Sequence, residues 1–283
     1  MKINLVLAAI SVFPLTAASG SEYKAEEREA IHHTFSKDTS LDIDNVNGTI
    51  TVTGDAGNTL RVEGEKIIRA LDQAELQKAK REVVVDVNEK DGVAQLYVNG
   101  PFRHNDSGTE DHGFHNHDKR RYEVTYNFIV HVPRGTALRL HTVNGGLKAT
   151  DTDGKFDLRT INGGITMTNI TGSGSADALN GATVITFREN PKASSFFKSF
   201  NGKVDVTFRP ALAADLRVKT FNGHAYTDFE VTALPTPAGP GEKQNGKFVY
   251  KSDKFSALRV GSGGPELKFE TFNGDIHIQK DRK

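Results

Sequence analysis

Along most of the chain, apolar residues alternate with polar ones at a period of two, which is typical of β-strands with one buried face. Residues 122–132 show the alternation most clearly, because every second position there is apolar. Residues 83–87 and 93–98 are predicted to be two further strands, joined by a turn at Lys90-Asp91-Gly92. Residues 65–81 differ, since their apolar positions recur among charged ones at helical spacing. They predict one short amphipathic helix.

The dipeptide Asn-Gly occurs nine times, and at seven of these places its surroundings recur with it. The residue before the Asn is always apolar, and the residue two before it is small or polar and usually carries a hydroxyl group. The residues four before, three after and five after the Asn are mostly apolar, and the five central copies are 18, 18, 21 and 21 residues apart. Each unit is therefore predicted to be strand, corner, strand. The corner residues are Asn47, Asn144, Asn162, Asn180, Asn201, Asn222 and Asn273.

Two arrangements explain these units. In a β-hairpin, Asn-Gly fills a two-residue type I′ turn, in which both residues need a positive φ angle. In a β-solenoid, each unit is one coil, and the side chains of stacked corner asparagines form a hydrogen-bonded ladder. The near-constant spacing and the constant Asn favour the second arrangement. We therefore predict an all-β fold, a single-stranded parallel β-helix or β-solenoid with Asn-Gly corners every 18–21 residues, plus one short helix near the N-terminus.

The first residues of the chain are typical of an export signal. Residues 1–19 combine a positive Lys2, a short apolar stretch and small residues at the end, which predicts a secretory signal peptide. The apolar stretch is too short to span a bilayer comfortably, and no later segment is apolar enough to do so. We therefore expect no transmembrane segment in the mature chain, which should be periplasmic or secreted to the cell surface.

The mature chain is predicted to have two parts. Residues 22–135 form an N-terminal β-rich part that includes the short helix and a His-rich loop at 99–121. Residues 136–280 form the β-solenoid repeat domain, which a Pro- and Gly-rich insertion at 231–251 interrupts. The start of the mature chain, with His32 and His33, is expected to be flexible.

Charge and cysteine content exclude several functions. The 36 basic and 36 acidic residues balance, so the basic excess that supplies most of the affinity for nucleic acid is missing. We expect no nucleic-acid partner. Because the chain has no cysteine, disulfides, thiolate metal sites and thiol catalysis are also excluded.

Several sequence segments resemble a known family. The TxNGxI units, the early NVNGTITVTG unit and the late GSGGPELKFETFNGDIHI segment resemble a bacterial putative-adhesin family of unknown function with β-strand repeats, which is similar to the head-GIN domain proteins. The resemblance covers roughly residues 40–280. It implies an exported β-repeat protein and supplies no catalytic residues. The His-rich and Pro-rich insertions depart from the simple repeat.

The His-rich loop is the strongest candidate for local chemistry. Imidazole groups with carboxylates nearby bind Zn²⁺ and related ions, so zinc is the one candidate cofactor. The spacing matches no closed metal site, and a solvated loop that is rich in histidine explains the residues as well. The candidate metal ligands are His104, His112, His115 and His117.

Phenylalanines accumulate in the late units, where they predict either a core ladder or an exposed surface for sugar or protein contact. At four and at one position before the Asn, we expect the core ladder, because Phe is often fully buried. Adjacent Phe196 and Phe197 cannot both point inward from one regular strand. The residues in question are Phe196, Phe197, Phe200, Phe208, Phe221, Phe229, Phe269 and Phe272.

We do not expect an enzyme, because the aspartates of the units do not recur at one position and no catalytic motif has a supporting context. The sequence predicts a non-enzymatic exported cell-envelope protein, adhesin-like or a scaffold, that acts by surface contact of a β-repeat face. Its partner would be an envelope protein or a polysaccharide. One alternative is a periplasmic metal- or glycan-binding module centred on the His-rich loop. A carbohydrate-active enzyme is the third hypothesis.

Overall fold

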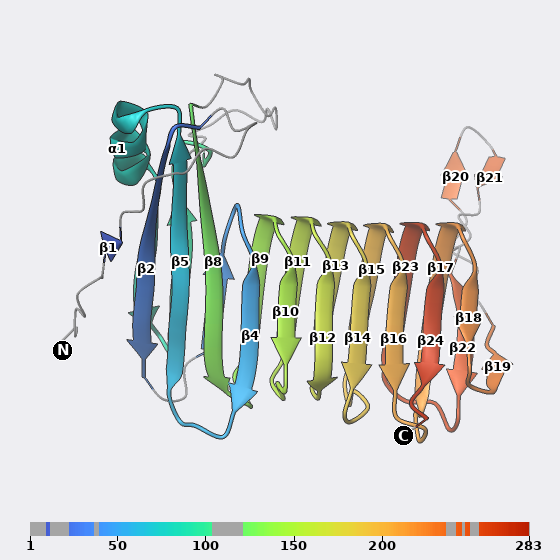
Figure 1. The fold of residues 1–283 in the computed structure, drawn as a ribbon. Coiled ribbons are helices and arrows are strands. Elements are labelled where there is room, and N and C mark those ends of the chain that lie inside the picture. Colours follow the sequence, from blue (N-terminus) through green and yellow to red (C-terminus); the bar gives the residue numbers. More distant parts are fainter. Residues whose placement is uncertain are drawn as a thin grey trace.

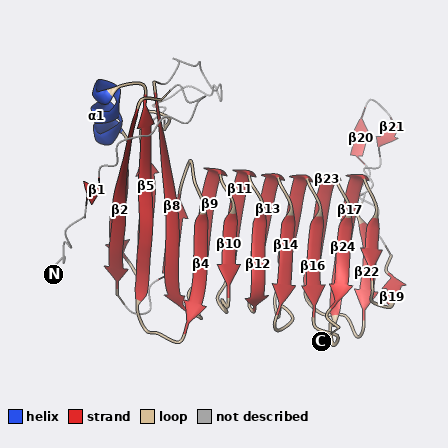
Figure 2. Ribbon diagram, viewed as in Figure 1, coloured by secondary structure: helices blue, strands red, loops and turns tan. Residues whose placement is uncertain are grey.

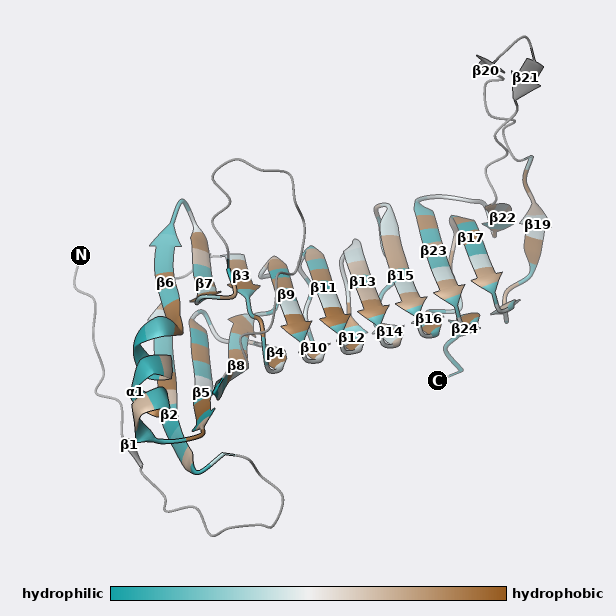
Figure 3. Cartoon of the chain, turned by 90° about the horizontal axis from the view of Figure 1, so that it is seen from above, coloured by the Kyte–Doolittle hydropathy of each residue, from teal (hydrophilic) through white to brown (hydrophobic). Residues whose placement is uncertain are grey.

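The computed structural model describes residues 10–11, 23–36, 40–103, 121–235, 242–244, 247–249 and 255–282. Most of this part of the chain is β-strand, and its one helix is short (Figure 2). Nearly all of its strands belong to two sheets of 11 strands each, which lie face to face and give the molecule an elongated, flat shape (Figures 1 and 3). The prediction of a mostly β fold with one helix is confirmed.

Sheet I runs along one face of the molecule. Its first four strands pair antiparallel, and every pair from β8 onward is parallel. In spatial order it contains β1 (Ile10–Ser11), β2 (Ala25–Phe35), β5 (Leu60–Ala70), β8 (Tyr122–Pro133), β4 (Ile50–Asp55), β10 (Leu147–Thr150), β12 (Ile165–Ile170), β14 (Thr183–Phe187), β16 (Val204–Phe208), β24 (Ile276–Lys280) and β18 (Ala225–Thr227).

Sheet II runs along the opposite face. Its central strands are parallel, and the strands at its two ends are antiparallel. In spatial order it contains β19 (Val231–Ala233), β22 (Ser256–Val260), β17 (Ala214–Asn222), β23 (Glu266–Asn273), β15 (Ser195–Asn201), β13 (Gly174–Asn180), β11 (Phe156–Asn162), β9 (Leu138–Asn144), β3 (Ser40–Asp44), β7 (Val93–Asn99) and β6 (Val84–Lys90). A separate pair is formed by β20 (Glu242–Gln244) and β21 (Lys247–Val249).

Each Asn-Gly corner joins a strand of sheet II to a strand of sheet I. The strand before Asn144, for example, is β9 in sheet II, and the strand after it is β10 in sheet I. The hairpin alternative is therefore wrong at these corners. Among the described residues, the only non-glycine residues with positive φ are Asp91, Asp151 and Asn169. A type I′ turn needs positive φ at both central residues, and Asp91 (52°) with Gly92 (74°) meets this condition in the β6–β7 hairpin.

A single parallel β-helix is not confirmed. Neither sheet is purely parallel, and the order of the units in space departs from their order along the chain. The unit around Asn273 lies between the units of Asn201 and Asn222, because β23 pairs with both β15 and β17. At the other end, the first unit is also enclosed by later strands. In sheet II, β3 lies between β7 and β9, and in sheet I, β4 lies between β8 and β10.

The core fills the space between the two sheets. Strands of both sheets alternate buried and partly exposed residues, so every second side chain points toward the opposite sheet. Four phenylalanines meet in the late units, with ring centroids of Phe187 and Phe208 5.1 Å apart and those of Phe197 and Phe269 5.3 Å apart. All four are at most 1% exposed. Burial of such side chains supplies much of the stability of a chain without disulfides.

The helix α1 (Gln73–Glu82) begins later than predicted. Residues 65–70 belong instead to β5, because they are hydrogen-bonded on both sides, to β2 and to β8. The Asp72 side chain accepts a hydrogen bond from the backbone N–H of Glu75 at 2.9 Å and caps the true start of the helix. The helix contributes only Leu76 and Ala79 to the buried core.

The prediction that the segment around His32 and His33 is flexible was also wrong. His32 and His33 lie in the 11-residue strand β2, which pairs with β5 over its whole length. The acidic side chains of this strand explain why its alternation is hard to recognise. Glu27 lies 2.5 Å from Lys80 of the helix, and Glu29 lies 3.2 Å from the same ammonium group. These ion pairs fasten α1 to β2.

Candidate functional site

The seven corner asparagines form one continuous ladder along the molecule. Each asparagine after Asn47 donates a hydrogen bond from its side-chain Nδ2 to the Oδ1 of the asparagine before it in the stack, over 2.7–2.9 Å. At the N-terminal end, Asn47 Nδ2 donates to the backbone carbonyl of Val124 at 3.3 Å. The ladder holds every corner in register with the next one. Its spatial order is Asn47, Asn144, Asn162, Asn180, Asn201, Asn273 and Asn222.

The glycine of each corner is required by close stacking. A Cβ atom on Gly145 would lie 2.0 Å from the carbonyl oxygen of Gly48, and a Cβ on Gly163 would lie 2.0 Å from that of Gly145. Neither Gly145 nor Gly163 has a positive φ angle, so space rather than backbone conformation excludes a side chain there. Sequence reasoning had attributed the glycine to the geometry of a turn or a corner, and the structure supplies the physical cause.

The hydroxyl groups two positions before the Asn satisfy the corner backbone. The Oγ1 of Thr160 donates to the carbonyl oxygen of Gly145 at 2.8 Å, and the Oγ of Ser199 donates to that of Gly181 at 2.8 Å. Thr271 makes the same bond to Gly202 at 2.9 Å. These residues are buried, and a buried carbonyl without a partner would be costly. This pairing explains why small hydroxylated residues recur at the position.

The residues immediately before each Asn form a row on the outer face of sheet II. Positions two and four before the Asn point into the core, so the alternation of the strand directs the position immediately before the Asn outward. In Figure 3 the ends of these strands are brown where they enter the corners. We call these residues the apolar row. In spatial order they are Val46, Val143, Ile161, Leu179, Phe200, Phe272 and Phe221.

The expected burial of the phenylalanines is half right. Four positions before the Asn, Phe197 and Phe269 are fully buried, as predicted. At one position before it, the prediction was wrong, because Phe200, Phe272 and Phe221 are 37%, 38% and 63% exposed. The parity of the strand already contained this signal, since neighbouring residues of a regular strand face opposite sides. The prediction of opposite directions for Phe196 and Phe197 is consistent with their burial, partial and complete respectively.

The three exposed phenylalanines are stacked on one another. The ring centroids of Phe200 and Phe272 are 4.8 Å apart and those of Phe272 and Phe221 are 4.7 Å apart, both at an interplanar angle of 6°. Both faces of the middle ring are therefore covered by its neighbours. The stack presents ring edges to solvent over most of its length, and the two end rings, Phe200 and Phe221, each have one face without a phenylalanine against it.

Paired charges flank the apolar row. Three positions before the Asn, the outer face of sheet II carries Lys198 beside Asp177 at 3.7 Å and Lys219 beside Glu270 at 3.6 Å. Asp44 and His141 continue this line at 3.4 Å. Burial raises the pKa of Asp44, but hydrogen bonds from His141 and Arg103 outweigh it and lower the pKa below its usual value. The flank is thus close to neutral, and the apolar row stands out from it.

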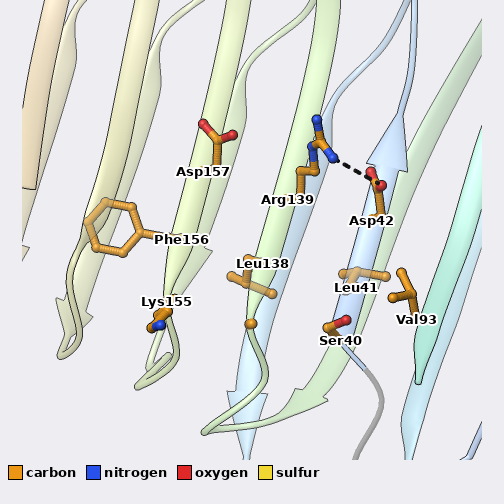
Figure 4. Close-up of a pocket in the computed structure, with 10 residues that line it drawn as sticks. Ser40, Leu41, Asp42, Val93, Leu138, Arg139, Lys155, Phe156 and Asp157 are labelled. Atoms are coloured by element: carbon orange, nitrogen blue, oxygen red, sulfur yellow. Dashed lines mark ion pairs between the residues drawn. The ribbon is translucent and has the colours of Figure 1, made fainter. Parts of the chain in front are cut away.

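A shallow pocket of about 300 Å³ lies near the start of β3, β9 and β11 (Figure 4). Asp42 and Arg139 face each other across it at 4.0 Å. Burial raises the pKa of Asp42, and Arg139 offsets this only in part. The neighbouring Asp157 pairs with Arg159 at 3.1 Å. General acid–base catalysis needs groups that converge on one reacting atom, and this arrangement of separately paired charges offers no such geometry.

The predicted metal ligands His104, His112, His115 and His117 lie outside the described residues. Within the described ranges, no group of three or more His, Asp or Glu side chains is arranged to hold a metal ion. Three of the six histidines found there, His141, His224 and His277, pair singly with a carboxylate, for example His277 with Asp205 at 2.7 Å. The zinc hypothesis stays a prediction.

Comparison with known proteins gives only distant similarities. No family model matches the chain, and no curated protein matches it. A solved "putative cell adhesion protein" from Clostridium sporogenes is 11% identical, with a TM-score of 0.35, over 89% of this chain and 100% of that one. A "putative lipid binding protein" from Parabacteroides distasonis is 9% identical, with a TM-score of 0.23, over 89% of this chain and 97% of that one. At these scores neither similarity supports a functional argument.

No helix in the part of the chain that the structure describes is long and apolar enough to cross a bilayer.

Proposed function

We propose that this protein is a non-enzymatic, exported cell-envelope protein that acts by surface contact, as an adhesin-like protein or scaffold, with the apolar row as its contact surface. The observation that supports this proposal is the exposed half of the row. Leu179, Phe200, Phe272 and Phe221 are 37–63% exposed and follow one another on four adjacent strands. Contiguous exposed apolar patches mark interaction sites, whereas scattered apolar side chains do not.

The corner ladder makes the row suited to binding. Each row residue precedes an asparagine that is hydrogen-bonded to its neighbours, so its backbone is fixed before any partner arrives. A surface that is already ordered loses less conformational entropy on association. Complete burial of one such side chain contributes on the order of 1.5–3 kcal/mol, so the four partly exposed residues together can support specific contact.

The geometry of the stack favours a protein partner. Sugar rings bind aromatic side chains face to face, but both faces of Phe272 are already covered, and only the outer faces of the two end rings, Phe200 and Phe221, have no phenylalanine against them. Ring edges and the Leu179 side chain form a narrow apolar strip instead. Such a strip complements apolar side chains of another polypeptide better than it complements a polysaccharide.

The proposal is tested with a variant that changes the row alone. We would immobilise the purified protein, the triple variant Phe200→Ser/Phe221→Ser/Phe272→Ser and the control Ile129→Ser/Val84→Ser. Ile129 (52% exposed) and Val84 (39% exposed) are matched apolar residues away from the row. Each protein is then offered to a cell-envelope extract, after circular dichroism has shown that it is folded. A specific partner should be retained by the original protein and the control, and lost by the triple variant.

Equal retention by all three proteins would overturn the proposal. A fourth protein separates it from the metal- or glycan-binding alternative. In it, residues 104–120 are replaced by a Gly-Ser linker of equal length, while Arg103, which binds Asp44, is kept. Loss of the partner in this protein alone would place the function in the His-rich loop, and the effect of added Zn²⁺ would then be measured.

A further inference from the structure

We propose that Asn222 is a site of spontaneous deamidation in the folded protein, and that the other six Asn-Gly corners are protected from this reaction by the stack. Asn-Gly is chemically the most susceptible dipeptide, because glycine has no side chain to hinder the approach of its backbone nitrogen. Seven corners of this kind would expose the protein to chemical damage at each of them if all were free to react. The structure distinguishes one of them from the rest.

The reaction needs only water and mild base. The backbone nitrogen of Gly223, after losing its proton, attacks Cγ of Asn222 and forms a new N–C bond in a five-membered succinimide ring. The bond between Cγ and Nδ2 breaks, and ammonia leaves. Water then opens the ring at either carbonyl to give aspartate or isoaspartate. Two things must therefore be free: the glycine N–H, and the asparagine side chain that has to turn toward it.

Six corners hold both groups. The glycine N–H donates to the backbone carbonyl oxygen of an asparagine in the adjacent unit, over 2.8–3.1 Å, and the asparagine side chain is hydrogen-bonded both as a donor and as an acceptor. Attack would require all three bonds to break inside the stack. The glycines concerned are Gly48, Gly145, Gly163, Gly181, Gly202 and Gly274.

The seventh corner lies at the open end of the ladder. No unit follows it, so among the described residues the N–H of Gly223 has no hydrogen-bond acceptor. The Asn222 side chain donates to Asn273 Oδ1 at 2.7 Å, but its own Oδ1 accepts no hydrogen bond from any residue that the structure describes. Residues 221–228 are all exposed to solvent. Two of the three restraints are thus missing at this corner.

The chain contains its own control. Residues 220–223 and 271–274 have the same sequence, Thr-Phe-Asn-Gly, so Asn222 and Asn273 have closely similar intrinsic reactivity. Trypsin separates them into the peptides 220–243 and 269–280. We would incubate the folded protein in mildly alkaline buffer and follow the mass gain and the isoaspartate in each peptide over several days. We expect conversion at Asn222 to be at least tenfold faster than at Asn273.

Unfolding provides the second arm. In concentrated urea the two peptides should convert at rates within about twofold of each other, because no corner is then stacked. Equal rates in the folded protein, or no conversion of Asn222 there while both sites react in urea, would overturn the proposal. The Asn222→Gln variant should abolish the conversion in peptide 220–243 while it keeps an amide at this position.

Deamidation would place a negative charge beside Phe221, the most exposed residue of the apolar row. We therefore expect the Asn222→Asp variant to bind a partner of the row more weakly. This consequence rests on the proposed function, whereas the difference in rate between Asn222 and Asn273 does not. The two can fail separately, because the rates are measured without any partner.

Discussion

Two adjacent glycines, Gly145 and Gly146, should respond in opposite ways to the same substitution. In Gly145→Ala, the new Cβ would lie 2.0 Å from the carbonyl oxygen of Gly48. Unstrained carbon–oxygen contacts are about 3.3–3.6 Å, so the stacked corners would have to separate by more than 1 Å. In Gly146→Ala, the nearest atom is the carbonyl oxygen of Gly164 at 3.6 Å, an ordinary contact.

The expected magnitudes follow from these distances. Separation of this corner from the corner of Gly48 stretches the bond from the Gly48 N–H to the Asn144 carbonyl and the hydrogen bond from Thr142 to the Gly48 carbonyl, at about 1 kcal/mol each. The strain of overpacking adds about 1–3 kcal/mol. We therefore expect Gly145→Ala to lower the free energy of unfolding by about 3–5 kcal/mol. Gly146→Ala should raise it by about 0.4–1 kcal/mol, because alanine restricts the unfolded chain at a position whose φ is not positive.

Equilibrium unfolding in urea, followed by circular dichroism in the far ultraviolet, tests this pair. A shift of the midpoint at an unchanged slope reports a change in stability, and a changed slope would show that the transition itself has altered. The close approach of the stacked corners predicts a large loss for one variant and a slight gain for its neighbour. Equal shifts, or a neutral Gly145→Ala, would show that stacking distance does not determine the choice of glycine.

Two further predictions concern side-chain hydrogen bonds. Thr160→Val removes the buried hydroxyl that donates to Gly145 and should lower the free energy of unfolding by about 1–3 kcal/mol. The control Thr166→Val, on the exposed outer face of sheet I, should change it by less than about 0.5 kcal/mol. Urea unfolding measures both. For Asp44, whose pKa is lowered in the folded state, the ionised carboxylate stabilises the fold above its unfolded pKa of about 3.9, and this contribution is lost as the pH falls through the lower folded pKa. Asp44→Asn should therefore reduce the melting temperature at neutral pH, and its difference from the original protein should shrink in acid; a difference that is independent of pH would contradict this assignment.

The repeat pattern was sufficient to predict the units but not their order in space. The alternation around each Asn separates inward from outward positions, although the phenylalanines immediately before the Asn were wrongly expected in the core. The ladder of amides follows from stacking identical corners. Nothing in the local sequence of the Asn273 unit shows that it lies between the units of Asn201 and Asn222. That order depends on which strand edges are free when the late units pair, and it is decided by long-range contacts.

Two errors share a physical cause. In both, the parity of a strand was overlooked: the segment 65–70 was assigned to a helix because its apolar positions fit helical spacing, and Phe200, Phe221 and Phe272 were assigned to the core because of their residue type. Lys66 illustrates the difficulty: it is only 6% exposed and lies 3.8 Å from Glu29, so a charged residue occupies a position that an apolar pattern would reserve for the interior. Its pKa is lowered by burial. Tertiary ion pairs of this kind cannot be read from one strand alone.

The displaced position of the Asn273 unit determines when the molecule can be completed. Strands β17 and β18 are synthesised before β23 and β24, yet in the finished structure the later pair separates them from β15 and β16. Until residues 266–280 are available, β17 and β18 have no strand to pair with on the side that faces β15 and β16. In the finished structure they lie two strand spacings, or roughly 10 Å, from β15 and β16. The C-terminal segment thus acts as the last inserted layer, and the molecule cannot assemble simply in the order of translation.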